Sequence, residues 1–228
     1  MKKFILGTIV CLIATAGAFC DDVDAGFQFN FGFAPTYTSN RNFNSSAADS
    51  KTTNFKGEIL FGGYSADPGL NIGIHFGLGF EKDVYNLTSA LPVYTISDET
   101  YKVSQNPDFW DLYATARFAM EFRISALSIG ASTGINMGYG RFSFITPKSL
   151  TNTCTYSEND IFVDIPIEPY AAISFGRKAR LNAGCNWDLP FLHLVFSGKD
   201  GDSQKFTTRF FNKDDIAPTV LVSLSLFL

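Results

Sequence analysis

The sequence predicts an all-β protein, an eight-stranded antiparallel up-and-down β-barrel that spans a membrane. Three observations lead to this fold. First, stretches of about ten residues alternate between large apolar and small or polar side chains, which is the period of a two-faced β-strand. Second, about 9 to 11 residues suffice for a tilted strand to cross the hydrocarbon of a bilayer. Third, short and long connections alternate along the chain, and the composition pairs 24 Phe with 19 Gly.

The N-terminus has the three-part layout of a secretory signal peptide, predicted to cover residues 1–20. Two lysines precede a short apolar run, and a cluster of small residues follows it. Cleavage can follow Ala18 or Cys20, and we favour the later site. Acylation of Cys20, as in a lipoprotein, is the alternative, which the bulky Phe19 before it disfavours. Residues 21–228 are predicted to form one domain, the barrel itself.

The clearest strand is 70–80, LNIGIHFGLGF, in which six large apolar residues alternate with Asn, Gly and His. Residues 25–37 repeat this pattern with four Phe on one face. Residues 55–64 do so with charged side chains opposite the apolar ones. The polar residues 38–54 between the first two strands predict a long loop, and 65–69 predict a tight turn.

The middle of the chain follows the same plan. Residues 81–108 predict a second long loop. Residues 109–122 are predicted as a strand rather than a helix, because a period of 3.6 would bring Asp111 and Arg117 into the apolar stripe. The strand 126–139 has almost only small residues on its second face.

The rest of the chain supplies three more predicted strands. Pro166 and Pro169 each remove a hydrogen-bond donor from the first of them, which is therefore predicted to be the weakest strand of the set. The predicted elements are a loop at 145–160, strands at 161–175, 181–191 and 219–228, and a loop at 195–215.

Three tight turns and four long loops connect the eight strands. Alternation of this kind, with an even strand number, is the layout of barrels in the bacterial outer membrane, where the tight turns and both termini lie on the inner side. Closure of the sheet leaves no backbone group unpaired in lipid. Aromatic residues at the ends of the stripes fit interfacial girdles: Tyr37, Phe55, Phe80, Trp110, Tyr139 and Phe191 on the outer side, and Phe27, Phe122 and Phe175 on the inner side.

On these patterns, the chain resembles the small eight-stranded outer-membrane barrels of the OmpW, OmpX and OmpA-barrel type over essentially its whole mature length. The terminal strand is the most specific feature, since proteins of this class end in an alternating strand that the barrel-assembly machinery reads. Here the last residue is Leu228 and the aromatic residue, Phe227, precedes it. The resemblance implies that this machinery is a partner and that the barrel is a narrow conduit for small solutes.

Most charged residues of the predicted strands occupy the alternate positions whose side chains point into the barrel. Because a barrel of eight strands has room only for its own side chains or one small ligand, these residues predict either a packed polar plug or a narrow conduit. We expect Arg117 to pair with inward carboxylates, since an unpaired buried charge is costly. The predicted lumen-lining residues are Lys56, Glu58, His75, Asp111, Arg117, Glu121, Asp164, Glu168 and Asp188, and Glu81 has the same parity.

The sequence predicts no enzyme, metal site, cofactor or nucleic-acid partner. The net charge is −4 and no Lys/Arg cluster could neutralise phosphates. His75 has no second His or thiolate at ligand spacing. His193 precedes Asp200, Asp202 and Ser203, which could form the external rim site of a lipid acyltransferase barrel, but such residues are ordinary in polar loops.

Two roles therefore stay open. The inward charges slightly favour a conduit for small solutes. The long loops at 38–54 and 81–108 slightly favour a non-conducting scaffold that acts as an adhesin or binds host or matrix surface ligands. In both cases the expected location is the bacterial outer membrane, with its lipid as a partner.

Overall fold

The computed structural model contains twelve β-strands in its described part. The described residues are 23–36, 46–47, 51–65, 69–86, 93–96, 99–102, 107–147, 153–176, 178–199, 205–210 and 218–227. Within these ranges, the structure has no helix long and apolar enough to span a membrane. The strands are β1 (Val23–Thr36), β2 (Ser46–Ala47), β3 (Lys51–Ser65), β4 (Gly69–Asn86), β5 (Val93–Ile96), β6 (Glu99–Lys102), β7 (Asp108–Ile124), β8 (Leu127–Pro147), β9 (Thr153–Phe175), β10 (Ala179–Lys199), β11 (Lys205–Phe210) and β12 (Pro218–Phe227).

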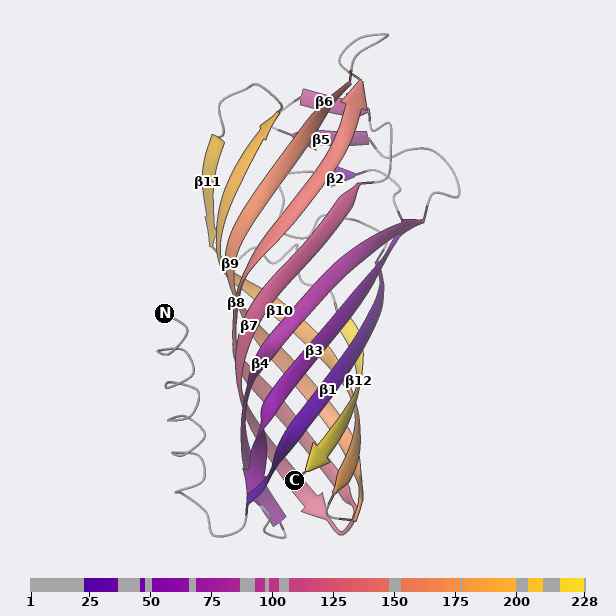
Figure 1. Ribbon diagram of the computed structural model, residues 1–228, viewed down its shortest axis with the longest axis vertical. Helices are drawn as coiled ribbons and strands as arrows, with labels where there is room; N and C mark the ends of the chain where they lie inside the picture. Colours follow the sequence, from indigo (N-terminus) through magenta and orange to yellow (C-terminus); the bar gives the residue numbers. More distant parts are fainter. Residues whose placement is uncertain are drawn as a thin grey trace.

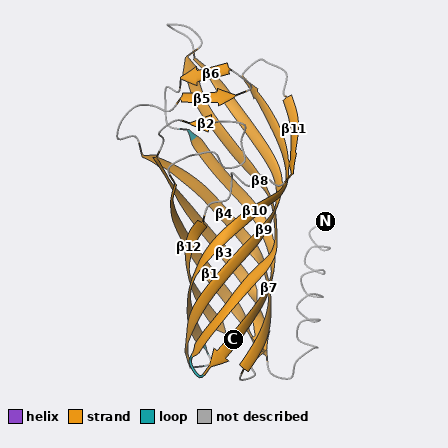
Figure 2. Ribbon diagram, turned by 180° about the vertical axis from the view of Figure 1, so that it is seen from behind, coloured by secondary structure: helices purple, strands orange, loops and turns teal. Residues whose placement is uncertain are grey.

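Eight of these strands form a closed antiparallel ring (Figure 1). Their order is β10-β12-β1-β3-β4-β7-β8-β9, and β9 pairs again with β10. The ring closes between the two ends of the chain, where β1 pairs with β12 from Gly26↔Phe227 to Phe33↔Val220. The strands are tilted against the long axis, as the view from behind also shows (Figure 2). The ninth strand of the sheet, β11, continues it beyond β10.

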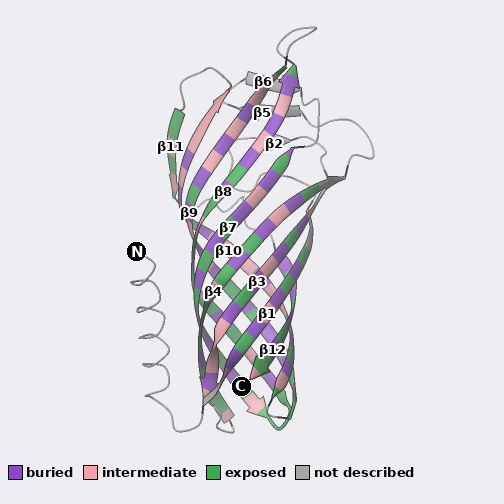
Figure 3. Cartoon of the chain, viewed as in Figure 1, coloured by how far each residue is buried: buried purple, intermediate pink, exposed green. Residues whose placement is uncertain are grey.

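Burial alternates residue by residue along the ring strands (Figure 3). In β7, for example, odd-numbered residues from Phe109 to Glu121 are buried, while even-numbered ones are mostly exposed. The exposed face is apolar: Ile74 is 46% exposed and Leu78 is 69% exposed. The two faces are those that the alternation predicted. The aromatic residues expected at the stripe ends are outward too, apart from Tyr37, which lies outside the described residues.

The predicted long loops are partly strand. The prediction of a loop at 145–160 was wrong, because β8 continues to Pro147 and β9 begins at Thr153. Within the predicted loop 195–215, β10 continues to Lys199 and pairs with β11. The predicted loops 38–54 and 81–108 contain β2, β5, β6 and the ends of β3, β4 and β7. The apolar period fades in the extensions of β8 and β9 because their outward residues are mostly polar, and in β10 it is interrupted by the register shift between Pro190 and Leu192. These three strands extend well beyond β1 and β12 at one end of the ring, called the outer end below (Figure 1).

The strand predicted to be the weakest, β9, is the longest, with 23 residues. Its prolines do leave a mark, since residue pairing with β10 skips from Tyr170 to Ile167, and pairing with β8 skips from Ile167 to Asp164. Each skipped stretch contains one proline, which has no N–H to donate. The strand persists because the rest of it is paired on both edges.

A small sheet of order β2-β5-β6 lies at the outer end, with β6 beside β8 (Figures 1 and 2). The inward residues of the β8 and β9 extensions include three aromatic side chains, Phe142, Phe144 and Tyr156. Phe142 and Phe144 are 0% and 2% exposed, and the ring of Phe144 stacks on that of Tyr156 with centroids 5.1 Å apart. The predicted signal peptide, residues 1–20, lies outside the described residues.

Candidate functional site

An arginine lies between carboxylates from two other strands in the middle of the ring. Arg117 on β7 donates through Nη2 to Oε1 of Glu58 on β3, and through Nη1 to Oε2 of Glu168 on β9, both at 2.5 Å. Glu58 also accepts hydrogen bonds from the Tyr113 hydroxyl and the Asn30 amide, each at 2.7 Å. The expected pairing of Arg117 is therefore present, and every oxygen of Glu58 has a donor.

A second ion pair lies nearer the outer end. Lys56 on β3 contacts Asp188 on β10 with Nζ 2.5 Å from Oδ2. Asp188 accepts two further hydrogen bonds, from the amides of Asn136 at 3.0 Å and Asn186 at 2.7 Å. Because β3 and β10 are separated by two strands on the shorter way around the ring, this pair also bridges the interior.

A third ion pair lies near the inner end, between Arg180 on β10 and Glu121 on β7. Arg180 Nη1 is 2.9 Å from Glu121 Oε1, and Nη2 contacts Oε2. The guanidinium also lies 4.6 Å from the centre of the Tyr64 ring, a cation–π contact. Sequence reasoning missed Arg180 because the predicted strand 181–191 begins one residue after it. Arg180 lies two residues before the inward Asn182, and this alternation could have predicted that the Arg180 side chain also points inward.

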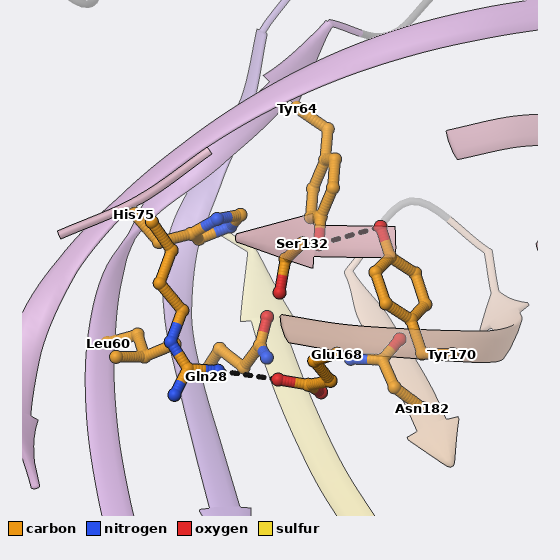
Figure 4. A pocket seen from close by; sticks show the side chains of 9 residues that line it. Gln28, Leu60, Tyr64, His75, Ser132, Glu168, Tyr170 and Asn182 are labelled. Carbon is orange, nitrogen blue, oxygen red and sulfur yellow. Dashed lines mark hydrogen bonds and ion pairs between the residues drawn. The ribbon is translucent and has the colours of Figure 1, made fainter. Parts of the chain in front are cut away.

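Between the central and inner ion pairs, the interior leaves a cavity of about 10 Å³, room for about one water molecule (Figure 4). His75, Ser132 and Glu168 line it, and the hydroxyls of Tyr64 and Tyr170 face one another at 3.4 Å. His75 itself is 5% exposed and packs beside Tyr64 with ring centroids 4.8 Å apart. The described side chains thus pack this region closely.

The remaining predicted lumen residues are also inward. Glu81 and Asp111 are cross-strand neighbours on β4 and β7, 5% and 6% exposed. Carboxylates exceed Lys and Arg in the described interior, where Lys56, Arg117 and Arg180 are buried. The buried carboxylates are Glu58, Glu81, Asp83, Asp111, Glu121, Glu158, Asp160, Asp164 and Glu168, and Asp188 is partly buried.

His193 lies between two of these carboxylates. Its Nδ1 is 2.5 Å from Asp160 Oδ2 and its Nε2 is 2.8 Å from Asp164 Oδ1, and its ring stacks on Phe162. Strict alternation would have turned His193 outward. A register shift between Pro190 and Leu192 turns it inward, and a β-bulge of this kind leaves no clear sequence signal.

The two carboxylates favour the charged imidazolium, in which both ring nitrogens donate. After the register shift, the outward residues that flank His193 on β10 are Leu192 and Leu194, so His193 lies within the apolar part of the strand.

The rim site considered around His193 is not described as such, since Asp200, Asp202 and Ser203 lie outside the described residues. The described partners of His193 are carboxylates on β9. No group of three or more His, Cys, Asp or Glu in the described ranges is arranged to hold a metal ion.

Comparisons with known proteins found similarity among solved structures. No family model matches the chain, and no curated protein matches it. A major outer membrane protein from Thermus thermophilus is 13% identical, with a TM-score of 0.49, over 89% of this chain and 99% of that chain. Salmonella typhi OmpF in complex with daunomycin is 6% identical, with a TM-score of 0.14, over 90% of this chain and 97% of that chain.

Proposed function

We propose that this protein is an eight-stranded β-barrel of the bacterial outer membrane with a closed interior, and that it serves as a scaffold for binding at the cell surface. The observation that carries this proposal is the bridge of Arg117 to Glu58 and Glu168 across the ring, beside a cavity with room for about one water molecule.

The outward face supports a membrane location. Exposed apolar side chains follow one another around the ring, and contiguous apolar surface of this extent is rare on soluble monomers. In a lipid environment these apolar side chains are not exposed to water. The backbone N–H and C=O groups, which lipid cannot hydrogen-bond, are paired around the closed ring. The outward residues include Phe31, Ile59, Ile72, Leu78, Leu112, Phe118, Ile129, Met137, Ile161, Ile173, Leu181 and Val222.

The packing of the interior favours a non-conducting scaffold rather than a conduit. Three ion pairs link separate walls, and the aromatic side chains of the β8 and β9 extensions add an apolar layer at the outer end. A solute would have to break several buried ion pairs to pass, which is costly. A conduit for small solutes is the second candidate function, and one observation favours it: inward carboxylates outnumber inward Lys and Arg. This excess would make an opened interior cation-selective.

The outer end offers the binding surface. The extensions of β8, β9 and β10, together with β11, form a sheet that stands beyond the ends of β1 and β12 (Figure 1). Loops and strand extensions on a rigid barrel are common places for binding. We therefore assign the binding role to this end.

The purified protein is expected to require detergent, to migrate faster on an electrophoretic gel unheated than boiled, and to show no steady conductance in planar bilayers. Recovery as a soluble, detergent-independent monomer would refute the membrane location. A steady conductance of the wild-type protein would instead refute the closed interior and favour the conduit.

A further inference from the structure

Three outward side chains lie next to one another on β4, β7 and β8. Lys82 pairs in register with Trp110, and Trp110 pairs with Arg141. Directly opposed residues on antiparallel strands have Cβ atoms about 4.5 to 5.5 Å apart when they lie on one face. The strands therefore place an indole between two basic side chains.

These residues lie at the outer border of the apolar stripe. The outward residues that precede them towards the inner end are Phe80, Leu112 and Tyr139, which are 43%, 54% and 40% exposed. The rings of Trp110 and Tyr139 are 5.7 Å apart. Trp and Tyr favour the boundary between hydrocarbon and headgroups, so the two basic residues are at headgroup depth.

The basic side chains are available for an anion. Arg141 is exposed and forms no ion pair with any other described residue. Lys82 contacts Asp108 at 3.0 Å, but their side chains are 44% and 53% exposed. An exposed pair of this kind contributes little, so a stronger anionic partner can replace Asp108.

The geometry points to a binding site for the phosphate headgroup of an anionic lipid in the outer leaflet, formed by Lys82, Trp110 and Arg141. The guanidinium of Arg141 can donate two hydrogen bonds to one phosphate, and Lys82 adds a second positive charge. Trp110 and Tyr139 pack against the upper part of the acyl chains. This inference rests on the membrane location proposed above.

The two tryptophans of the chain allow a direct test. In Trp187→Phe, Trp110 is the sole tryptophan, and excitation at a wavelength that tyrosine does not absorb makes it the reporter. In Trp110→Phe the reporter is Trp187, whose cross-strand neighbours Ile167 and Pro218 carry no charge. Each variant is placed in nanodiscs of phosphatidylcholine that contain either brominated phosphatidylglycerol or brominated phosphatidylcholine, with the bromine near the headgroup. Bromine quenches only a nearby indole.

We expect the brominated anionic lipid to quench Trp110 in preference to the zwitterionic one, and to show no such preference for Trp187. Adding Lys82→Gln or Arg141→Gln should lower the preference of Trp110 about fivefold each, the change expected for one basic group at a lipid surface. An equal preference at Trp187, or one that survives both substitutions, overturns the site.

Two further outcomes matter. The first shows whether the site binds a lipid headgroup or free phosphate. The second separates a failure of the headgroup site from a failure of the proposed membrane location. If inorganic phosphate removes the preference and sodium chloride of the same ionic strength does not, the site takes free phosphate and the lipid assignment is wrong. If neither brominated lipid quenches either tryptophan, the proposed membrane location fails. Quenching without lipid preference leaves that location intact and refutes only the headgroup site.

Discussion

Replacing Arg117 with Ala is expected to lower the free energy of unfolding by about 3 to 5 kcal/mol, because it leaves Glu58 and Glu168 buried without their cation. It should also open the closed interior. The lost guanidinium is the bridge between these carboxylates, and water that enters to solvate them widens the path. Denaturant unfolding in detergent measures the first effect, and planar-bilayer recordings measure the second as a new, cation-selective conductance.

Two controls make this result specific. Lys178→Ala, in the turn between β9 and β10, removes an exposed charge and should change neither quantity. Arg117→Met combined with Glu58→Gln and Glu168→Gln removes the charges together and should recover most of the stability, since a neutral interior of similar volume is well tolerated. An Arg117→Ala protein as stable and as closed as the wild type would mean that the bridge does not hold the interior together.

Ile74→Arg is expected to prevent or sharply reduce assembly into the membrane. Ile74 faces outward near the middle of the apolar stripe 70–80 of β4 and is 46% exposed. A charged side chain on the lipid face near the bilayer midplane costs about 2 to 4 kcal/mol. The fraction of protein that migrates faster on a gel when unheated measures assembly.

The next residue provides a matched control. His75 is directed inward, 5% exposed, beside the water-sized cavity, so His75→Ala should assemble. If both variants assemble equally, the faces of β4 are assigned wrongly, because a slip of one residue exchanges them. If His75→Ala fails and Ile74→Arg assembles, the lipid is on the other face.

The alternation in the sequence was sufficient to place the inward charges. A period of two leaves no freedom once the outer face must be apolar, so the facing of Glu58, Arg117 and Glu168 followed from parity alone. The same rule restricted the candidate partners of Arg117 to the inward carboxylates, because only these can reach its guanidinium. The choice among them required the strand order and the tilt.

Other parts of the interior could not be predicted. Arg180 sits one residue inside β10, and the ends of an element are the hardest part of it to locate. His193 is turned inward by a register shift that the residue types in this stretch do not predict. The strand extensions of β8 and β9 continue where the outward side chains become polar, and there the apolar period that identifies a strand no longer exists.

The pairing of β1 with β12 also sets an order in time. Every other pair in the ring joins strands that are close in sequence or separated by one loop, so these hairpins can form from contacts between nearby segments of the chain. Gly26 must wait for Phe227, near the far end of the chain. Until β12 has paired with it, β1 presents a free edge to any other extended chain, and an edge of this kind is prone to aggregate. The pairing of the two ends therefore closes the longest loop of chain in the ring, and the edge of β1 needs protection until this pairing has formed.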